Sequence, residues 1–162
     1  MGSREEWLSF FTIAYCPLPT AAFLSSNEGV GLTSGSSNIR SYRDLVVWQE
    51  AMALAEMAYR LTATFPKDEI YGMVQQARRA AVSIPANIAE GYGRETKGAY
   101  IQFLRVAQGS LKELETHLML AGRVELVRQF AQEPLLSKCE AVGKMLRALI
   151  RSWESSENRS PT

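Results

Sequence analysis

Apolar residues recur at steps of three and four along four stretches of the chain between residues 41 and 155. This spacing places them on one face of an α-helix. The first helix is expected to begin at Ser41, which forms a capping-box pattern with Asp44, and to stop at residues 64–66 (TFP). Its apolar residues fall in two adjacent rows, the first comprising Leu45, Trp48, Met52, Ala55 and Tyr59 and the second comprising Val47, Ala51, Leu54, Ala58 and Leu61. A helix that is apolar on two sides usually has two partners. We therefore expect the first row to face the core and the second to contact another subunit.

Three further helices are expected after short connections. The second runs from about Lys67 to Ala89, the third from about Thr96 to Ala121, and the fourth from Pro134 to Trp153. The expected inward positions are Ile70, Met73, Ala77, Ala81, Ile84 and Ile88 on the second helix, Tyr100, Leu104, Ala107, Leu111, Leu114, Leu118 and Ala121 on the third, and Leu135, Cys139, Val142, Leu146, Leu149 and Trp153 on the fourth. Because short connections favour antiparallel neighbours, the sequence predicts an all-α, up-down-up-down four-helix bundle.

Pro85 lies inside the second predicted helix. An interior proline removes a backbone donor and crowds the carbonyl four residues earlier, at a cost of roughly 3 kcal/mol. We therefore expect a kink in this helix at Pro85. Ser83, two residues earlier, is expected to offer its hydroxyl to a backbone carbonyl near the break.

The second helix also carries a row of polar side chains on one side, at steps of three and four: Gln76, Arg79, Ser83, Asn87 and Glu90. If the third helix folds back antiparallel, Arg79 comes level with Ser110 and Glu113, which predicts an ion pair between Arg79 and Glu113. One interpretation is that these groups satisfy one another and fix the helix register. The alternative is a binding groove along the row. We prefer the first interpretation.

Composition restricts the classes of function. The chain has 162 residues, enough for one domain with a real core. Its net charge of +1 argues against a large phosphate-binding surface, but a local patch is compatible with it. Such a patch is predicted around the turn between the second and third helices, from Arg78, Arg79, Arg94, Lys97 and Arg105. The competing interpretation is a solvated surface whose charges are compensated by Glu90 and Glu95.

No motif for catalysis or for metal binding stands out. The chain has one histidine, His117, and two cysteines, Cys16 and Cys139, which do not form a metal-ligand pattern or a disulfide framework. No apolar run reaches the roughly 18–20 residues that span a bilayer. We therefore expect a non-enzymatic cytoplasmic protein with no cofactor, no metal and no membrane partner.

Residues 1–40 are expected to lie outside the bundle. The apolar run from Trp7 to Cys16 has the length of a signal peptide, but Glu5 and Glu6 offset the charge of Arg4 before it. Residues 25–37 are rich in serine and glycine, the composition of a flexible linker. We interpret residues 1–40 as a disordered or atypical extension, with a weak signal peptide as the alternative. Residues 41–155 then form the bundle, and residues 156–162 form a polar tail.

Four segments resemble a known family: residues 42–49 (YRDLVVWQ), 65–72 (FPKDEIYG), 78–93 (RRAAVSIPANIAEGYG) and 109–116 (GSLKELET). They are similar to the four-helix bundle family encoded in intervening sequences of bacterial 23S ribosomal RNA genes, over about residues 42–153. The resemblance implies a ring-like homopentamer. It also implies kinship with the accessory protein of diversity-generating retroelements, a pentameric bundle that binds a reverse transcriptase and nucleic acid. No catalytic residues follow from it.

Two hypotheses about function result. The first is a homo-oligomer, with a pentamer favoured, that acts as a scaffold or as an RNA-associated accessory protein. The alternative is a nucleic-acid-binding module that uses the arginines and the lysine near the turn between the second and third helices.

Overall fold

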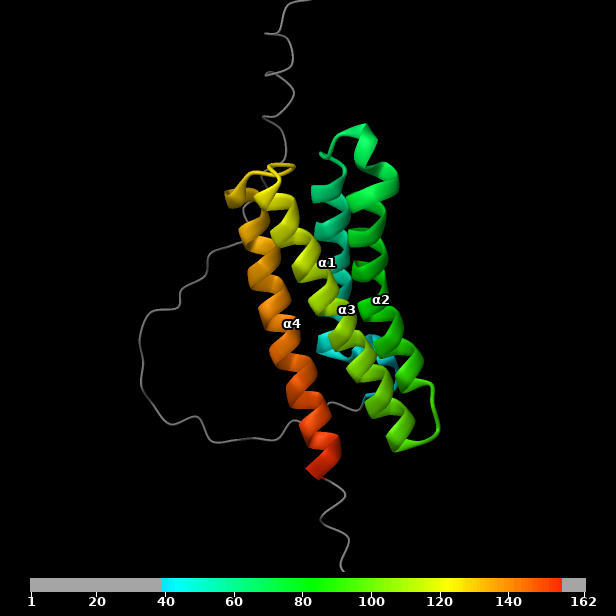
Figure 1. Ribbon diagram of the computed structural model, residues 1–162. Coiled ribbons are helices and arrows are strands. Elements are labelled where there is room, and N and C mark those ends of the chain that lie inside the picture. The colour runs from blue at the N-terminus through cyan, green and yellow to red at the C-terminus, as the bar shows by residue number, and fades with distance from the viewer. Residues whose placement is uncertain (1–38, 156–162) are drawn as a thin grey trace, which may run out of the picture. The chain divides into compact units, whose positions relative to one another are not determined.

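The computed structural model describes residues 39–155, and four α-helices account for most of that part of the chain (Figure 1). They are α1 (Val46–Thr62), α2 (Gln75–Tyr92), α3 (Lys97–Arg123) and α4 (Gln129–Ser155). Each helix runs antiparallel to the one before it (Figure 1). No strand occurs within residues 39–155. The predicted all-α, up-down-up-down bundle is therefore confirmed. The predictions for residues 1–38 and 156–162 lie outside the described residues.

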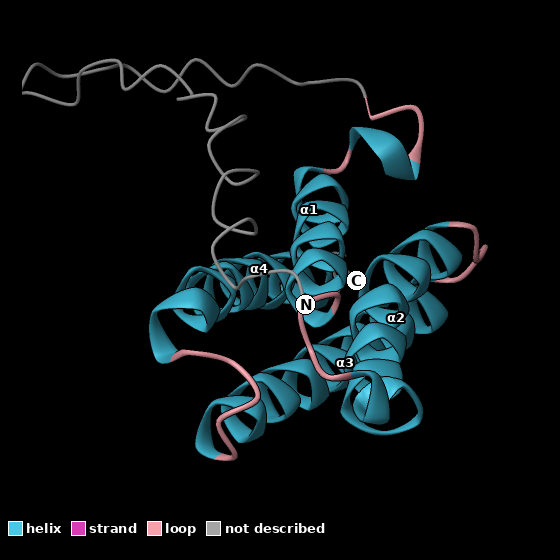
Figure 2. Cartoon of the chain, turned by 90° about the horizontal axis from the view of Figure 1, so that it is seen from above, coloured by secondary structure: helices cyan, strands magenta, loops and turns pink. Residues whose placement is uncertain are grey.

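The four helices surround a common core. Seen from above, α1 lies opposite α3, and α2 lies opposite α4 (Figure 2). Neighbouring helices are in contact around this arrangement, α1 with α2, α2 with α3, α3 with α4, and α4 with α1. The order in space thus follows the order in sequence, as short connections favour.

Helix α1 buries the row that we expected to face another subunit. Ala51, Leu54 and Ala58 are fully buried, whereas Met52 and Tyr59 from the other row are 38% and 44% exposed. The assignment was therefore wrong for the second row and for Met52 and Tyr59, whereas Leu45 and Ala55 of the first row are buried as expected. The buried row is rich in alanine, whose small side chain lets neighbouring helices come close. Met52 and Tyr59 of the other row remain at the surface beside α2.

Two short irregular elements connect α1 to α2. A 3-10 turn (Lys67–Glu69) leads into a π-helical segment (Ile70–Val74), in which Gly72 has non-helical backbone angles, φ −102° and ψ −114°. Because α2 proper begins only at Gln75, Ile70 is 49% exposed instead of facing the core as predicted. Helix α2 continues through Pro85 to Tyr92, and the irregular backbone in this part of the chain lies at Gly72.

The predicted ends of the helices were right in part. Ser41 and Asp44 do form a capping box, but it caps a short 3-10 turn (Tyr42–Asp44), and α1 starts after Leu45. The hydroxyl of Thr96 accepts a hydrogen bond from the backbone N–H of Ala99 and caps α3 as expected. Helix α4 begins at Gln129, so Pro134 lies inside it and not at its start.

Helix α3 ends one residue after Gly122 in a Schellman arrangement. The backbone N–H of Leu126 donates to the carbonyl of Ala121, and that of Glu125 donates to the carbonyl of Gly122. Glu125 has a positive φ of 59°, in the left-handed position that usually holds glycine. Gly122 has a different role, because a Cβ there would overlap the side-chain amide of Gln132 on α4, which would have to shift.

The apolar interior consists of one large cluster and one small one. The large cluster runs along all four helices, with Leu54, Ile84, Leu104, Leu111 and Leu146 among its most deeply buried side chains. All seven positions predicted to face inward on α3 are buried. The small cluster comprises Phe65, Val74, Ala121 and Val127, and lies where the α1–α2 and α3–α4 connections meet the helices.

A row of aromatic rings joins the four helices at the opposite end. Edge-to-face contacts link Tyr42 to Trp48, Tyr42 to Tyr92, Tyr92 to Tyr100, and Tyr100 to Trp153, with ring centroids 5.2–6.5 Å apart. These residues come from the start of α1 and the turn before it, the end of α2, the start of α3 and the end of α4. These aromatic contacts therefore hold the four helices together at the end of the bundle that is remote from the small cluster.

Candidate interaction site

The polar row on α2 makes hydrogen bonds to itself and to α3. The side-chain amide of Asn87 donates to the backbone carbonyl of Ser83 at 2.7 Å and to its hydroxyl at 3.0 Å. The Ser83 hydroxyl lies 2.8 Å from that of Ser110 on α3. Asn87, and not the Ser83 hydroxyl as predicted, thus supplies the extra hydrogen bond to a carbonyl near Pro85. The contact between Ser83 and Ser110 fixes the register of α2 against α3.

Ion pairs involve the second and the last members of the polar row, Arg79 and Glu90. Arg79 lies 3.8 Å from Glu113, which confirms the predicted pair, although both side chains are exposed and such pairs contribute little to stability. The same carboxylate lies 3.7 Å from Nε2 of His117. Glu90 pairs with Arg94 one turn later, at 2.5 Å. Gln76, the first member of the row, is half-buried.

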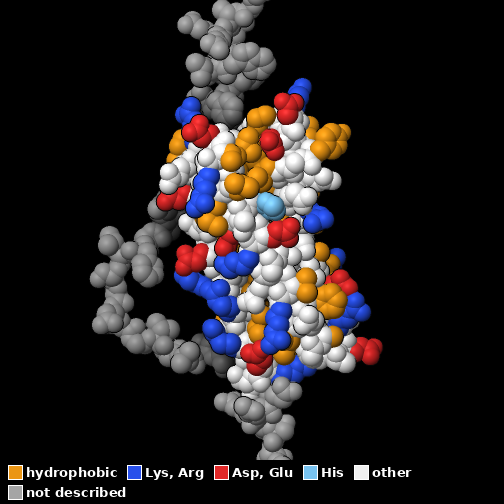
Figure 3. All heavy atoms as spheres, viewed as in Figure 1, with side chains coloured by type: hydrophobic (Ala, Val, Ile, Leu, Met, Phe, Trp, Pro, Cys, Tyr) orange, Lys and Arg blue, Asp and Glu red, His pale blue; other side chains and the backbone are white. Residues whose placement is uncertain are grey.

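The structure does not bring the five predicted cations together. Arg78 and Arg79 lie in the first turns of α2, whereas Arg94 and Lys97 flank the turn after it. At 1.5 Å per residue, Arg79 and Arg94 are separated by about 22 Å along the helix axis. Arg105 pairs with Glu154 of α4 at 2.9 Å. Figure 3 shows basic and acidic side chains interspersed on the face that it presents.

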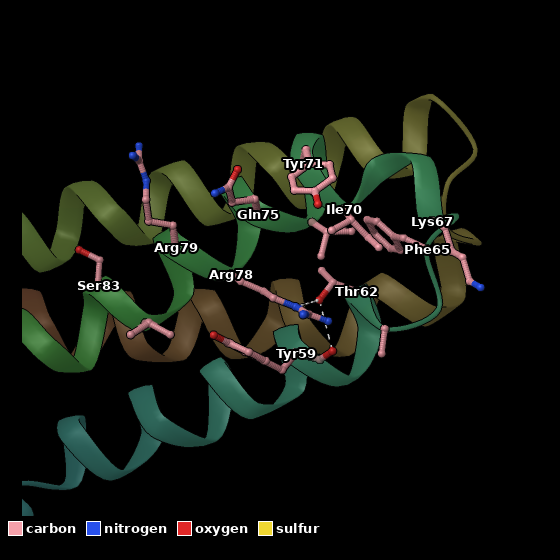
Figure 4. Close-up of a pocket in the computed structure, with 13 residues that line it drawn as sticks. Tyr59, Thr62, Phe65, Lys67, Ile70, Tyr71, Gln75, Arg78, Arg79 and Ser83 are labelled. Atoms are coloured by element: carbon pink, nitrogen blue, oxygen red, sulfur yellow. Dashed lines mark hydrogen bonds between the residues drawn. The ribbon is translucent and has the colours of Figure 1, made fainter.

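An open groove lies between α1 and the start of α2 (Figure 4). Its upper part has a volume of about 950 Å³, and a second hollow of about 500 Å³ continues along the same two helices. Both parts are lined by Tyr59 and Val82. Five further residues define what we call the α1–α2 groove: Met52, Ile70, Tyr71, Arg78 and Pro85.

Large apolar side chains line the groove while remaining accessible to solvent. Tyr71 is 88% exposed, and the exposed fractions of Met52, Tyr59, Val82 and Ile70 lie between 38% and 49%. Soluble monomers seldom leave a contiguous patch of such side chains uncovered without a functional reason. The groove is therefore the strongest candidate for an interaction site in the described part of the chain.

Arg78 is one of several polar side chains that line this groove. The others include Lys67, Gln75 and Arg79 in the upper part and Glu56 and Arg60 in the second hollow. The Nε of Arg78 donates to the hydroxyl of Thr62 at 2.8 Å, and its guanidinium lies over the ring of Tyr59, 4.8 Å from the centroid (Figure 4). Thr62 is only 2% exposed and donates its own proton to the carbonyl of Ala58 at 2.8 Å. Within residues 39–155, no carboxylate forms an ion pair with Arg78. The guanidinium is thus held at the C-terminal end of α1 without a carboxylate partner in this part of the chain.

The remaining chemistry of the described residues is sparse. No group of three or more histidine, cysteine, aspartate or glutamate side chains in residues 39–155 is arranged to hold a metal ion. Burial, with a smaller contribution from the nearby Glu115, raises the pKa of the Cys139 thiol to about 12. A thiol in that state is a poor nucleophile. None of the helices in this part of the chain is both long and apolar enough to span a membrane.

Sequence reasoning did not find the groove. It predicted Arg78 only as one member of a basic patch, because the contact with Thr62 and Tyr59 depends on how α1 and α2 align across an irregular connection. One signal was present: alanine at positions 51 and 58 marks the row of α1 on which another helix packs closely. The bulky Met52 and Tyr59 then have to lie outside.

Two comparisons with known proteins give matches. The family model described as "23S rRNA-intervening sequence protein" matches residues 43–148. The fold is similar to a crystal structure of a protein with unknown function from the S23 ribosomal protein family of Bacteroides thetaiotaomicron VPI-5482, with a TM-score of 0.61. The two chains are 24% identical, and the match covers 65% of this chain and 98% of that one. At this identity the likeness shows the fold alone. No curated protein matches the chain.

Proposed function

We propose that this chain, which belongs to the 23S rRNA-intervening sequence protein family, is a non-enzymatic assembly protein whose copies associate through the α1–α2 groove. The observation that carries the proposal is the continuous line of exposed apolar side chains along that groove. Covering these side chains removes apolar surface from water, which is the main driving force of protein association. A ring-like pentamer is the arrangement that the sequence resemblance implies.

The proposal differs from the sequence-based prediction in the surface that it uses. The row Val47, Ala51, Leu54 and Ala58 is buried within a single copy, so it is unavailable to a second one. Met52 and Tyr59 take its place, and α2 adds Val82 beside them. The exposed apolar surface is thus formed jointly by α1 and α2, so a partner that covers it has to contact both helices.

Light scattering after size-exclusion chromatography of the full chain tests the proposal. We expect an oligomer at micromolar concentration. Val82→Glu introduces a charge at an exposed position in the groove, so it should release monomers while leaving the helical circular dichroism unchanged. Val106→Glu is the matched control, because Val106 is 43% exposed on α3 and does not line the groove. A monomeric wild type, or equal effects of both substitutions, would contradict the proposal.

The alternative function is nucleic-acid binding by the predicted basic residues. Three of them face acidic partners in the structure, Arg79 with Glu113, Arg94 with Glu90, and Arg105 with Glu154, and these pairs have to open before phosphates can replace the carboxylates. Phosphate-driven binding weakens steeply with salt. A filter-binding assay with RNA at low and high salt therefore tests this alternative, and an absence of binding at low salt removes it.

A further inference from the structure

We propose that the partner in the α1–α2 groove is the start of α4 from a second copy, with Phe130 of that copy seated among the apolar side chains and its Glu133 paired with Arg78. The inference rests on the proposed self-association and names the two surfaces that meet. Such an interface is heterologous, because each copy contributes the groove on one side and the α4 start on the other. Repeated around an axis, such an interface gives a ring when the rotation between copies closes.

The state of Arg78 is the first reason. Its guanidinium is fixed by Thr62 and Tyr59 at the wall of the groove, yet it has no acidic partner within the described residues. If a second copy covers the groove, water is removed from this cation. A desolvated charge is strongly unfavourable unless an opposite charge accompanies it. The covering surface therefore has to supply a carboxylate close to an apolar side chain.

The start of α4 has this combination. Phe130 is 69% exposed, and Glu133 follows it at a spacing of three, on the same face of the helix. Glu133 is itself exposed and forms no ion pair within residues 39–155. An exposed aromatic ring with an adjacent unpaired carboxylate complements the upper part of the groove, where exposed apolar side chains lie beside the cations Lys67, Arg78 and Arg79.

The positions of the two surfaces allow a ring. Because the helices alternate in direction, α1 ends, α2 begins and α4 begins at the same end of the bundle (Figure 1). The upper groove and Phe130 therefore lie at a similar height, on α1–α2 and on α4 respectively. In a cyclic ring whose axis runs along the bundle, every copy points the same way, so contacting surfaces have to lie at the same height.

Charge reversal tests the pairing. Arg78→Glu and Glu133→Arg are each expected to weaken self-association of the full chain by at least about tenfold, measured by analytical ultracentrifugation. Combining the two restores opposite charges and should recover most of the affinity. Arg151→Glu and Glu95→Arg are controls that make the same charge changes at exposed positions outside both surfaces. They should leave the association constant unchanged.

Milder variants keep the test valid if a reversed charge disturbs the fold. Arg78→Gln, Glu133→Gln and Phe130→Ser remove the proposed contacts without reversing a charge, and circular dichroism checks that each variant is folded. If the wild type is monomeric, this pairing and the proposed function both fail. If the wild type assembles and Val82→Glu disrupts it while substitutions at Arg78, Phe130 and Glu133 have no effect, only this pairing is overturned.

Discussion

The hydroxyl oxygens of Ser83 on α2 and Ser110 on α3 lie 2.8 Å apart, and they form the centre of a continuous chain of polar contacts. Ser110 is also placed to donate to the carbonyl of Val106 at 3.2 Å, which leaves its oxygen free to accept from Ser83. The Ser83 oxygen can in turn accept from the amide of Asn87. Each donor in this series of hydrogen bonds has an acceptor, so no polar group is left unsatisfied where these side chains join α2 to α3.

Removing either serine hydroxyl should destabilise the bundle. We expect Ser83→Ala and Ser110→Ala each to lower the free energy of unfolding by about 1 kcal/mol, because each breaks a hydrogen bond in a partly buried place. The double variant should lose less than the sum, since both substitutions remove the same contact. Urea unfolding measures all three. Thr116→Ala, at an exposed hydroxyl on α3, is the control, and strict additivity of the two serine effects would show that the contact is not shared.

Two glycines should respond to alanine in opposite directions. A Cβ at Gly91 would lie 2.7 Å from the Cβ of Phe103 and 3.0 Å from the ring of Tyr100, so Gly91→Ala should push α2 and α3 apart and destabilise the fold by about 1–3 kcal/mol. Gly109 on α3 has no atom within 4 Å of the corresponding position. Gly109→Ala should therefore stabilise the fold by up to about 1 kcal/mol through helix propensity. Thermal melts of the two variants compare the effects directly.

Glu125 is a site where a substitution should increase stability. Its φ of 59° is costly for a residue with a side chain and costs glycine almost nothing. Glu125→Gly is therefore expected to raise the free energy of unfolding by about 1 kcal/mol, with Glu125→Ala as the control that keeps a Cβ. Should glycine and alanine at this position behave alike in chemical unfolding, the left-handed backbone would not be the source of the cost.

Alkaline pH should weaken the fold. Burial raises the pKa of Tyr100 to about 12 from its ordinary 10.0, with a smaller contribution from Tyr92, and raises that of Cys139 to about 12 from 9.0. The unfolded chain therefore loses these protons at lower pH than the folded chain, so stability is fully present below pH 9 and falls as the pH rises from 9 toward 12.

The pH dependence can be assigned with two phenylalanine variants. Tyr100→Phe removes one of the two buried acids, so its free energy of unfolding should fall less steeply than that of the wild type above pH 9. Tyr71→Phe changes a ring that is almost fully exposed and should leave the slope as it is. Urea unfolding at several pH values between 8 and 11 provides the measurement, and identical slopes for the wild type and Tyr100→Phe would contradict the assignment.

The sequence was sufficient where one helix face carries large apolar side chains and the others do not. On α3 every predicted inward residue is buried, and Thr96 caps the helix as its position suggested. Helix α1 has two apolar rows, and periodicity alone cannot say which one is buried. Side-chain size decides, since Ala51 and Ala58 permit close packing at their positions while the bulkier Met52 and Tyr59 do not. The candidate groove was missed because it follows from that choice.

Helix ends were predicted less well because glycine can either end a helix or make room for a neighbouring side chain, and proline can lie either at the start of a helix or inside it. Gly122 was taken as the stop of the third helix, but its lack of a side chain makes room for Gln132, and a glutamate occupies the left-handed position instead. Pro134 was taken as the start of the fourth helix, although α4 accommodates it one and a half turns in. The ion pair of Arg79 with Glu113 was predictable because the short turn after α2 fixes the register of α2 against α3.

The two ends of the bundle are built differently, and this difference bears on how the protein responds to a partner. Five interlocking rings close one end, whereas the other rests on the small cluster of Phe65, Val74, Ala121 and Val127. The connections at the second end carry part of the α1–α2 groove and lead into the start of α4. We expect hydrogen exchange to be faster there, so that both docking elements can adjust together while the aromatic end keeps the helices in register.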